Sequence, residues 1–458
     1  MSRRVVMSLL FFPRGGSAQV ARYMARALPR AGWDVTLVTG SLGEEGERSN
    51  ARTFFSGVDV RAVDYSRALE ADDPFACDPP LHPSFEDRPD APDRVFAALG
   101  DDVYERLVTA WQRELDAAGA GDADILHLHH LTPMNEAAAR SFPDVPVVGH
   151  LHGTEVLMLR EIERGAPEGW EHADAWAERM RRWARACERL LVLSPDAVER
   201  APDLLGVEPE RVVWAPNGFD PELFDRRPLH GEDRLVLWRR WLVEEPHGWD
   251  PESQEPGSVS YRQRDLDAFE GPVLLYVGRY TEVKRIPLLI RAHERARSRF
   301  REPVPLVLLG GYPGEWEGEH PLDVVRSVGA EEVFLAGWRS HDELAEALNA
   351  SDVVVLPSVH EQFGQVLVEG MACGLPSIAV DAHGPATIVD DGDTGWLVPP
   401  DDEEAMADAL VAAVNDAGER RRRGDAAYRV ARERYSWPAL VEGIARVYED
   451  ARSRRPAP

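Results

Sequence analysis

Short apolar runs alternate with stretches of helical periodicity along almost the whole chain. Most of these runs are continuously apolar, which is typical of strands buried on both faces of a parallel sheet. In the first half of the chain they span Val5–Phe12, Val35–Thr39, Ile125–His129, Val147–His150, Leu190–Ser194 and Val212–Ala215. In the second half they span Val273–Val277, Leu306–Leu309, Val333–Ala336, Val353–Leu356 and Ser377–Val380. The sequence therefore predicts an α/β protein with two doubly wound domains of similar size.

Changes in composition along the chain predict the domain limits. Residues 1–218 form the first α/β domain and residues 271–434 the second. Residues 219–270 are rich in Pro, Trp, Glu and Gly and show no strand rhythm, so we expect an irregular excursion or insertion there. Residues 435–458 are expected to form a last helix. Its pattern begins near Ser436-Trp437-Pro438, where Ser caps the helix and Pro occupies its first turn.

The charge of the chain limits its partners. With 52 basic and 80 acidic residues, the formal net charge is 52 − 80 = −28. This charge argues against nucleic acid as a partner and disfavours tight docking on anionic lipid, although a local basic patch would leave peripheral contact with a membrane open. Only one of the basic residues is a lysine, Lys284, which makes this position a candidate for a specific role.

The cysteines and the apolar segments favour a cytoplasmic protein. Cys77, Cys187 and Cys373 are odd in number and scattered, so they indicate neither a disulfide framework nor a zinc site. No stretch approaches the roughly 18 apolar residues of a membrane span. The N-terminus superficially resembles a signal peptide, but its apolar run Val5–Phe12 is short and leads into a turn, which favours a buried first strand.

Two glutamates lie on either side of a strand-to-helix junction in the second domain. The predicted strand Val353–Leu356 leads into a short loop with Glu361, and Phe363-Gly364 opens a helix that contains Glu369. Glu361 is therefore expected at the carboxyl end of a parallel strand, where α/β proteins bind ligands. The free N–H groups at the helix start favour an anion at the same place. A solvated acidic loop is the alternative interpretation.

Two cations follow the predicted strand Val273–Val277. Arg279 and Lys284 lie in Gly278-Arg279-Tyr280-Thr281-Glu282-Val283-Lys284. A guanidinium binds oxygens as a fork and an ammonium acts as a compact point charge, so the pair suits a diphosphate. Either residue alone would be an ordinary surface cation.

A glycine pair, Gly15-Gly16, follows the first predicted strand and allows close approach of a phosphate or a sugar. A dinucleotide site is disfavoured, because no third glycine follows at the proper interval and the second strand ends in Gly40-Ser41, where a ribose-binding acid would be expected. An ordinary tight turn remains the alternative.

Histidines cluster near two strand ends. His152, in the loop after the strand Val147–His150, is the better candidate for substrate contact. His127, His129 and His130 invite a metal interpretation, but they alternate along a predicted buried strand or its end, and no fourth ligand is evident. The sequence therefore predicts no metal site.

Together these motifs resemble the retaining glycosyltransferases of family 4, which have the GT-B fold. The resemblance is carried by Gly15-Gly16, His152-Gly153-Thr154, Pro216-Asn217-Gly218-Phe219-Asp220, Gly278-Arg279 with Lys284, and Pro357-Ser358 through Gly374-Leu375-Pro376. It covers nearly the whole chain. It implies two Rossmann-like domains facing a central cleft, an acceptor side in the first and a donor side in the second. The C-terminal helix would cross back to pack on the first domain.

The resemblance also implies a role for each donor-side residue. The donor would be a nucleotide diphosphate sugar, with a UDP-sugar preferred and a GDP-sugar second. Arg279 and Lys284 would neutralise its diphosphate, and Glu369 would bind the ribose hydroxyls. Glu361 and the backbone at Phe363-Gly364 would bind hydroxyls of the sugar.

In the first domain, His152 and the turn at Gly15-Gly16 would reach the donor. The catalytic set implied by the resemblance is Glu361, His152, Arg279 and Lys284. Transfer would retain the anomeric configuration, with the leaving phosphate taking the acceptor proton, and it would need neither a metal nor a cofactor. The acceptor would be a hydroxyl of a small molecule or a glycan.

Three other functions stay open on the same architecture. They are a sugar-nucleotide epimerase, a phosphorylase, and a catalytically inactive scaffold that binds a carbohydrate or a partner. A phosphorylase would need a lysine for pyridoxal phosphate, and Lys284 is better explained by a diphosphate. The intact set of Arg279, Lys284, Glu361 and Glu369 argues against an inactive scaffold.

Overall fold

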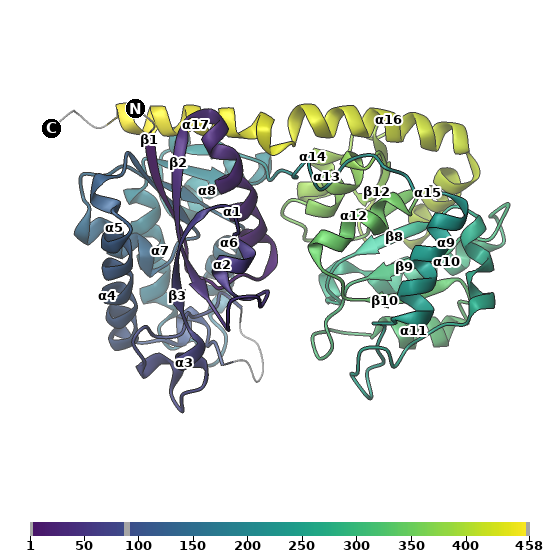
Figure 1. Cartoon of the computed structure of the whole chain (residues 1–458), viewed down its shortest axis with the longest axis horizontal. Helices are drawn as coiled ribbons and strands as arrows, with labels where there is room; N and C mark the ends of the chain where they lie inside the picture. The colour runs from purple at the N-terminus through teal and green to yellow at the C-terminus, as the bar shows by residue number, and fades with distance from the viewer. Residues whose placement is uncertain (1–2, 87–91, 455–458) are drawn as a thin grey trace. The chain divides into compact units, whose positions relative to one another are not determined.

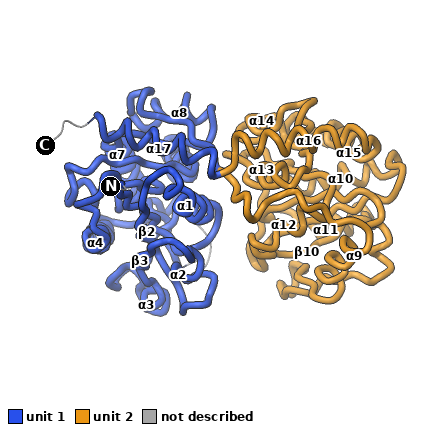
Figure 2. The backbone as a smooth tube through the Cα atoms, turned by 45° about the horizontal axis from the view of Figure 1, so that its top comes forward, with its two compact units in different colours: residues 1–217, 437–458 blue, residues 218–436 orange. Residues whose placement is uncertain are grey.

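The computed structural model describes residues 3–86 and 92–454. The chain divides into two compact units, which are shown in blue and orange in Figure 2. Unit 1 comprises residues 1–217 and 437–458, and unit 2 comprises residues 218–436. Each unit contains one parallel sheet with helices around it, which confirms the predicted two-domain, Rossmann-like α/β fold. The last four residues of the predicted C-terminal segment, 455–458, lie outside the described residues.

Unit 1 contains a seven-stranded sheet in the order β3-β2-β1-β4-β5-β6-β7, with all neighbouring strands parallel. The strands are β1 (Arg3–Leu9), β2 (Trp33–Ser41), β3 (Asp59–Asp64), β4 (Ile125–His129), β5 (Val147–His150), β6 (Arg189–Val192) and β7 (Val212–Trp214). The strand order reverses between β1 and β4, and in such sheets ligands bind at the carboxyl ends beside the reversal.

Seven longer helices belong to unit 1 among the described residues (Figure 1). They are α1 (Gly15–Ala27), α4 (Asp101–Ala117), α5 (Pro133–Ser141), α6 (Thr154–Gly165), α7 (Ala173–Ala186), α8 (Pro195–Leu205) and α17 (Trp437–Ser453). Although α17 ends the described chain, it packs against α1 and β5. Its buried residues include Val441, Ile444 and Tyr448, spaced three and four apart, so one apolar face of the helix covers the sheet.

Unit 2 contains a six-stranded parallel sheet in the order β10-β9-β8-β11-β12-β13. The strands are β8 (Leu274–Val277), β9 (Leu306–Leu309), β10 (Val333–Gly337), β11 (Val353–Leu356), β12 (Ser377–Val380) and β13 (Gly395–Val398). The helices are α9 (Gly231–Arg239), α10 (Ile286–Arg297), α11 (Pro321–Val328), α12 (His341–Asn349), α13 (Gln365–Ala372), α14 (His383–Ile388), α15 (Glu403–Asn415) and α16 (Ala417–Arg434). The order reverses between β8 and β11.

No helix of the described residues combines the length and the apolar composition that crossing a bilayer requires.

The segment 219–270, predicted as an irregular excursion, is largely folded. It contains α9, a π-helical turn at Arg240–Glu244 and a 3-10 helix at Gln263–Glu270. Trp238, Trp241 and Trp249 are all buried in unit 2. Charged residues and proline separate the tryptophans, so the sequence shows no regular apolar pattern. The segment is instead anchored by a few large rings, each of which packs into unit 2.

Replacing Trp249 with Ala tests whether this segment is part of the core of unit 2. The ring is fully buried against Trp316 and His320, with centroids 5.5 and 4.6 Å away, and its Nε1–H donates to Gly311 O at 2.9 Å. We expect Trp249→Ala to lower the free energy of unfolding by about 3–5 kcal/mol, measured by chemical denaturation. Val236→Ala, at a side chain 51% exposed in the same segment, should change it by less than about 0.5 kcal/mol. Equal losses would show that the segment contributes no specific packing.

Candidate active site

The residues predicted to bind a donor lie in unit 2 at or after the carboxyl ends of β8 and β11. These strands are neighbours in the sheet, with Val353 beside Leu274, so the loops that follow them emerge at the same edge. The first loop carries Arg279 and the short 3-10 turn Glu282–Lys284, which leads into α10. The second loop carries Glu361 and leads into α13. A backbone hydrogen bond from Val359 N to Val283 O, 3.0 Å long, joins the two loops.

Lys284 and Glu361 form an ion pair across these loops, from Nζ to Oε2. Their side chains are only 19% and 20% exposed, so both charges are largely withdrawn from water. A charge held in this way is costly when it is unpaired, so each residue helps to keep the other in place. The structure brings these two predicted site residues together.

Arg279 lies at the same strand end, with an exposed side chain. Its backbone carbonyl accepts a hydrogen bond of 2.9 Å from the Tyr276 hydroxyl, which anchors the backbone directly after β8. Tyr276 itself is fully buried. The anchor fixes the position from which the guanidinium extends.

The backbone around Phe363 and Gly364 is tightly enclosed. Phe363 is buried, and Gly364 has φ +99° as it precedes α13, a conformation that favours glycine. On the other side, Gly384 N donates to Glu361 O at 3.0 Å, and a Cβ on Gly384 would lie 2.4 Å from Phe363 Cα. The start of α14 therefore holds the Glu361 loop by direct backbone contact.

Glu369 lies inside α13 and is buried. Its Oε1 accepts hydrogen bonds from Gln365 Nε2 at 3.0 Å and interacts with His341 Nε2 at 2.8 Å. Gln365 Nε2 also donates to Gly218 O at 2.9 Å. The carboxylate is thus oriented by two side chains that the sequence analysis missed. The spacing of Gln365 and Glu369, one helical turn apart, was the available signal, whereas nothing local pointed to His341 at the start of α12.

In unit 1, Gly15 and Gly16 are exposed at the start of α1, after β1. Gly15 has φ +69°, and a Cβ built on either glycine would meet no atom within 4 Å. Gly16 therefore has no steric reason within its own unit to be glycine, although Gly15 has a conformational one.

His152 follows β5, and its backbone N–H donates to Glu155 Oε2 at 3.3 Å. Its ring nitrogen Nε2 lies 2.9 Å from Nδ1 of His129. Burial, with additional repulsion from His130 and His150, lowers the pKa of His152 well below its usual 6.5, so the ring is neutral at pH 7. A neutral ring can donate one hydrogen bond and accept another.

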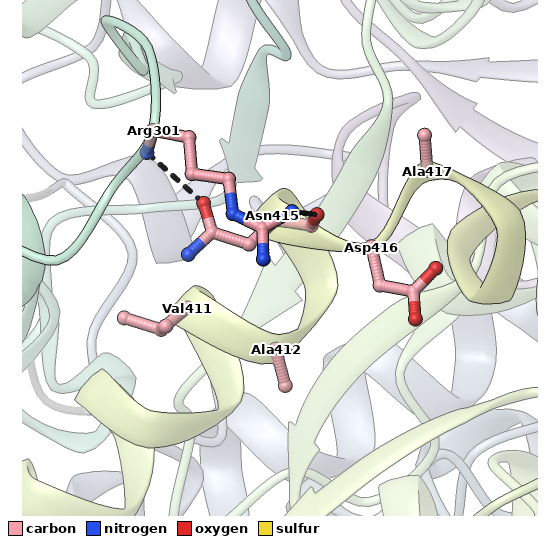
Figure 3. Close-up of a pocket in the computed structure, with 6 residues that line it drawn as sticks. All are labelled: Arg301, Val411, Ala412, Asn415, Asp416 and Ala417. Carbon is pink, nitrogen blue, oxygen red and sulfur yellow. Dashed lines mark hydrogen bonds between the residues drawn. The ribbon is translucent and has the colours of Figure 1, made fainter.

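A shallow hollow elsewhere in unit 2 is shown in Figure 3. It is lined by Arg301, Val411, Ala412, Asn415, Asp416 and Ala417. Arg301 precedes β9 and Asn415 ends α15, which places the hollow at the amino ends of the strands, away from Lys284 and Glu361. Arg301 N donates to Asn415 Oδ1 at 3.1 Å, so the polar groups there mainly tie α15 to the β9 loop.

Comparison with known proteins decides the family. The model of the family described as Glycosyltransferase Family 4 matches residues 14–223, and that of Glycosyl transferases group 1 matches residues 261–430. A D-inositol 3-phosphate glycosyltransferase of Kineococcus radiotolerans is 31% identical over 331 residues, covering 69% of this chain and 68% of that protein. The chain belongs to glycosyltransferase family 4. The predicted family is thereby confirmed.

Another relative matches this chain over less of its own length. A D-inositol 3-phosphate glycosyltransferase of Stackebrandtia nassauensis is 35% identical over 218 residues, which span 46% of this chain and about half, 49%, of that protein. Among solved structures, sucrose-phosphate synthase from Thermosynechococcus elongatus has a TM-score of 0.68 at 19% identity, covering 99% of this chain and 100% of that one. Anabaena HepE in complex with UDP-glucose has a TM-score of 0.62 at 17% identity, covering 97% and 99%. These likenesses show the GT-B fold.

Replacing Gly384 with Ala tests the backbone contact behind Glu361. The added Cβ would force Phe363 and the Glu361 loop to move, so we expect Gly384→Ala to lower the free energy of unfolding by about 1–3 kcal/mol, measured by chemical denaturation. Gly16→Ala is the matched control, because open space surrounds that position, and it should change stability by less than about 0.5 kcal/mol. A Gly384→Ala variant as stable as the control would contradict the described contact.

Proposed function

We propose that this protein is a retaining glycosyltransferase that moves a sugar from a nucleotide diphosphate sugar to an acceptor hydroxyl. The observation that carries the proposal is the Lys284–Glu361 ion pair at the carboxyl ends of β8 and β11, directly before α13, in a chain of family 4. A nucleoside diphosphate leaving group needs positive charge where its negative charge develops. Lys284 supplies it, with Arg279 at the same strand end.

A diphosphate can replace Glu361 as the partner of Lys284. An ammonium carries three donors and no fixed plane, so it can exchange one oxygen partner for another with little reorientation. When the donor binds, Glu361 becomes available for hydroxyls of the sugar. We assign the ribose hydroxyls to Glu369, whose carboxylate is held by His341 and Gln365.

In unit 1 we assign substrate contacts to His152 and to Gly15-Gly16. The neutral ring of His152 can hydrogen-bond a sugar hydroxyl without carrying a charge. Because Gly16 has no side chain, the space beside its backbone stays open for a ligand. The acceptor hydroxyl attacks the anomeric carbon on the face from which the diphosphate departs, and a departing phosphate oxygen takes its proton. The bond from the acceptor oxygen to the anomeric carbon replaces the bond to the diphosphate, and the proton ends on the diphosphate, so the reaction needs neither a metal nor a further cofactor.

We propose UDP-sugars as the first donors and GDP-sugars as the second. The structurally similar HepE was solved in complex with UDP-glucose, which supports the uracil donor. The relatives named D-inositol 3-phosphate glycosyltransferases make a phosphorylated polyol the first acceptor to try. The three cysteines are unpaired, which fits a reducing compartment such as the cytoplasm.

Incubation of the purified chain with a panel of nucleotide sugars, with and without acceptor, tests the proposal. We expect acceptor-dependent release of the nucleoside diphosphate and a product with the donor's anomeric configuration, both followed by NMR. An inverted product would contradict the retaining mechanism. An epimerised nucleotide sugar with no diphosphate released would instead establish the epimerase function.

Lys284→Ala should lower kcat by about 10²-fold or more, because it removes a charge that stabilises the leaving diphosphate. Its folding is checked by thermal unfolding. Arg291→Ala is the control: this α10 cation pairs with Glu319 at 2.7 Å and lies outside the proposed site, so kcat should stay near normal. Near-normal turnover of Lys284→Ala would overturn the phosphate assignment.

Lys284 is the only lysine of the chain, so amine-reactive reagents should modify this side chain and the N-terminus alone. Labelling at Lys284, read by mass spectrometry, should fall when the correct nucleotide sugar is bound, because a phosphate then covers the ammonium. Labelling at the N-terminus is the internal control. If no nucleotide sugar protects Lys284, the lysine does not contact the donor.

A further inference from the structure

We infer that His127, His129 and His150 of unit 1 form a binding site for a divalent transition-metal ion, for which Zn²⁺ is the best match. The inference goes beyond the proposed transfer reaction, since these residues lie apart from Lys284 and Glu361 in sequence and belong to the other unit. It also departs from the sequence-based expectation of no metal site, because the structure adds His150 to the histidines of β4.

The strand register places the three rings on one face of the sheet. His127 and His129 are two residues apart in β4 and therefore point to the same side. His129 is directly beside His150 in the parallel pairing of β4 with β5, so His150 points to that side as well. All three residues are at most 1% exposed. The cluster is thus built into the core of the sheet.

The ring nitrogens are spaced as metal ligands require. One ligand nitrogen from each of the three residues lies within 4.8 Å of the other two. His127 Nε2 and His150 Nδ1 are 3.2 Å apart. Two nitrogens bound to one tetrahedral zinc, each at about 2.0–2.1 Å, are about 3.3 Å apart. The third ring needs to approach by at most about 1.5 Å to complete a three-histidine set of the kind zinc accepts.

Two further ring nitrogens of the cluster are left without hydrogen bonds. Nε2 of His129 and Nε2 of His150 are both buried and have no hydrogen-bond partner among residues 3–86 and 92–454. A polar atom that is buried without a hydrogen-bond partner destabilises the fold. His129 Nδ1 is engaged by His152, so Nε2 is the His129 nitrogen that remains for an ion. Coordination through Nε2 of His129 would give that atom a partner, whereas Nε2 of His150 would stay without one when His150 binds the ion through Nδ1.

In metal sites, the ring nitrogen of a histidine that does not bind the ion is usually hydrogen-bonded to another protein group, and His127 has such a partner. The Tyr448 hydroxyl of α17 lies 2.6 Å from His127 Nδ1, which leaves Nε2 of that ring for the ion. The buried carboxylate of Glu155, 2.6 Å from His130 Nδ1, offsets part of the added positive charge.

The ion would also reach the proposed substrate contact. His129 Nδ1 lies 2.9 Å from His152 Nε2, so a metal on His129 fixes that ring and the hydrogen bond it makes to His152. Unit 2 contributes none of these ligands. Removing the ion should therefore leave binding of a nucleoside diphosphate to unit 2 unchanged while lowering the thermal stability of unit 1.

The test uses the full chain without a histidine tag. After treatment with a chelator, the protein is dialysed against Zn²⁺ and then against metal-free buffer, and its zinc is measured by mass spectrometry. We expect about one ion per chain and a zinc-dependent rise in Tm. The double variant His129→Gln/His150→Gln should lose both. The control His293→Gln removes a buried histidine of unit 2, whose Nε2 lies 2.8 Å from Val304 O, and should keep the zinc.

Replacement of zinc by Co²⁺ provides a second measurement on the unaltered protein. Tetrahedral cobalt absorbs visible light strongly, so a visible band that zinc abolishes is expected, and it decides the question even if the double variant fails to fold. Less than about 0.1 zinc per chain together with no cobalt band would overturn the inference. A folded double variant that retains zinc would overturn it as well, because the ion would then lie elsewhere.

Discussion

The ion pair of Lys284 with Glu361 is the interaction on which the geometry of the candidate site in unit 2 depends. Neither side chain is more than about one-fifth exposed, so removal of one partner would leave the other charge withdrawn from water. The pair can form because β8 and β11 are neighbours at the point where the strand order of unit 2 reverses. The contact of Gly384 with Phe363 supports the Glu361 loop from behind. Sheet topology thus places the two charges, and backbone packing keeps them in place.

Much of the fold and part of the site could be predicted from the sequence, because buried parallel strands are continuously apolar. The runs Ile125–His129, Leu306–Leu309 and Val353–Leu356 coincide with strands β4, β9 and β11. The strands that were missed, β3 and β13, are edge strands. Only Val63 of β3 is fully buried, so this strand lacks an apolar run. Residues placed by strand ends, such as Lys284 and Glu361, could therefore be proposed before the structure was known.

What could not be predicted depends on contacts between distant segments. His341 meets Glu369 only because α12 packs beside α13, and no local pattern encodes that contact. The histidine cluster has the same origin: His127 and His129 share a face by alternation, but the pairing of His129 with His150 requires the register of β4 and β5. A one-residue change of register would place His150 on the opposite face. The three-histidine cluster therefore could not be predicted from the sequence, whereas strands β4 and β5 could.

The solitary lysine can be understood from what the arginines do. The chain has 52 − 1 = 51 of them, and many hold surface carboxylates. Arg113 binds both oxygens of Asp78, at 3.1 and 2.9 Å, and Arg140 binds both of Glu105, at 2.6 and 2.9 Å. Such forks fix one partner in one geometry. We propose that the site releases Glu361 and accepts a phosphate. Such an exchange needs a cation without a fixed plane, so at this position lysine and arginine would not be interchangeable.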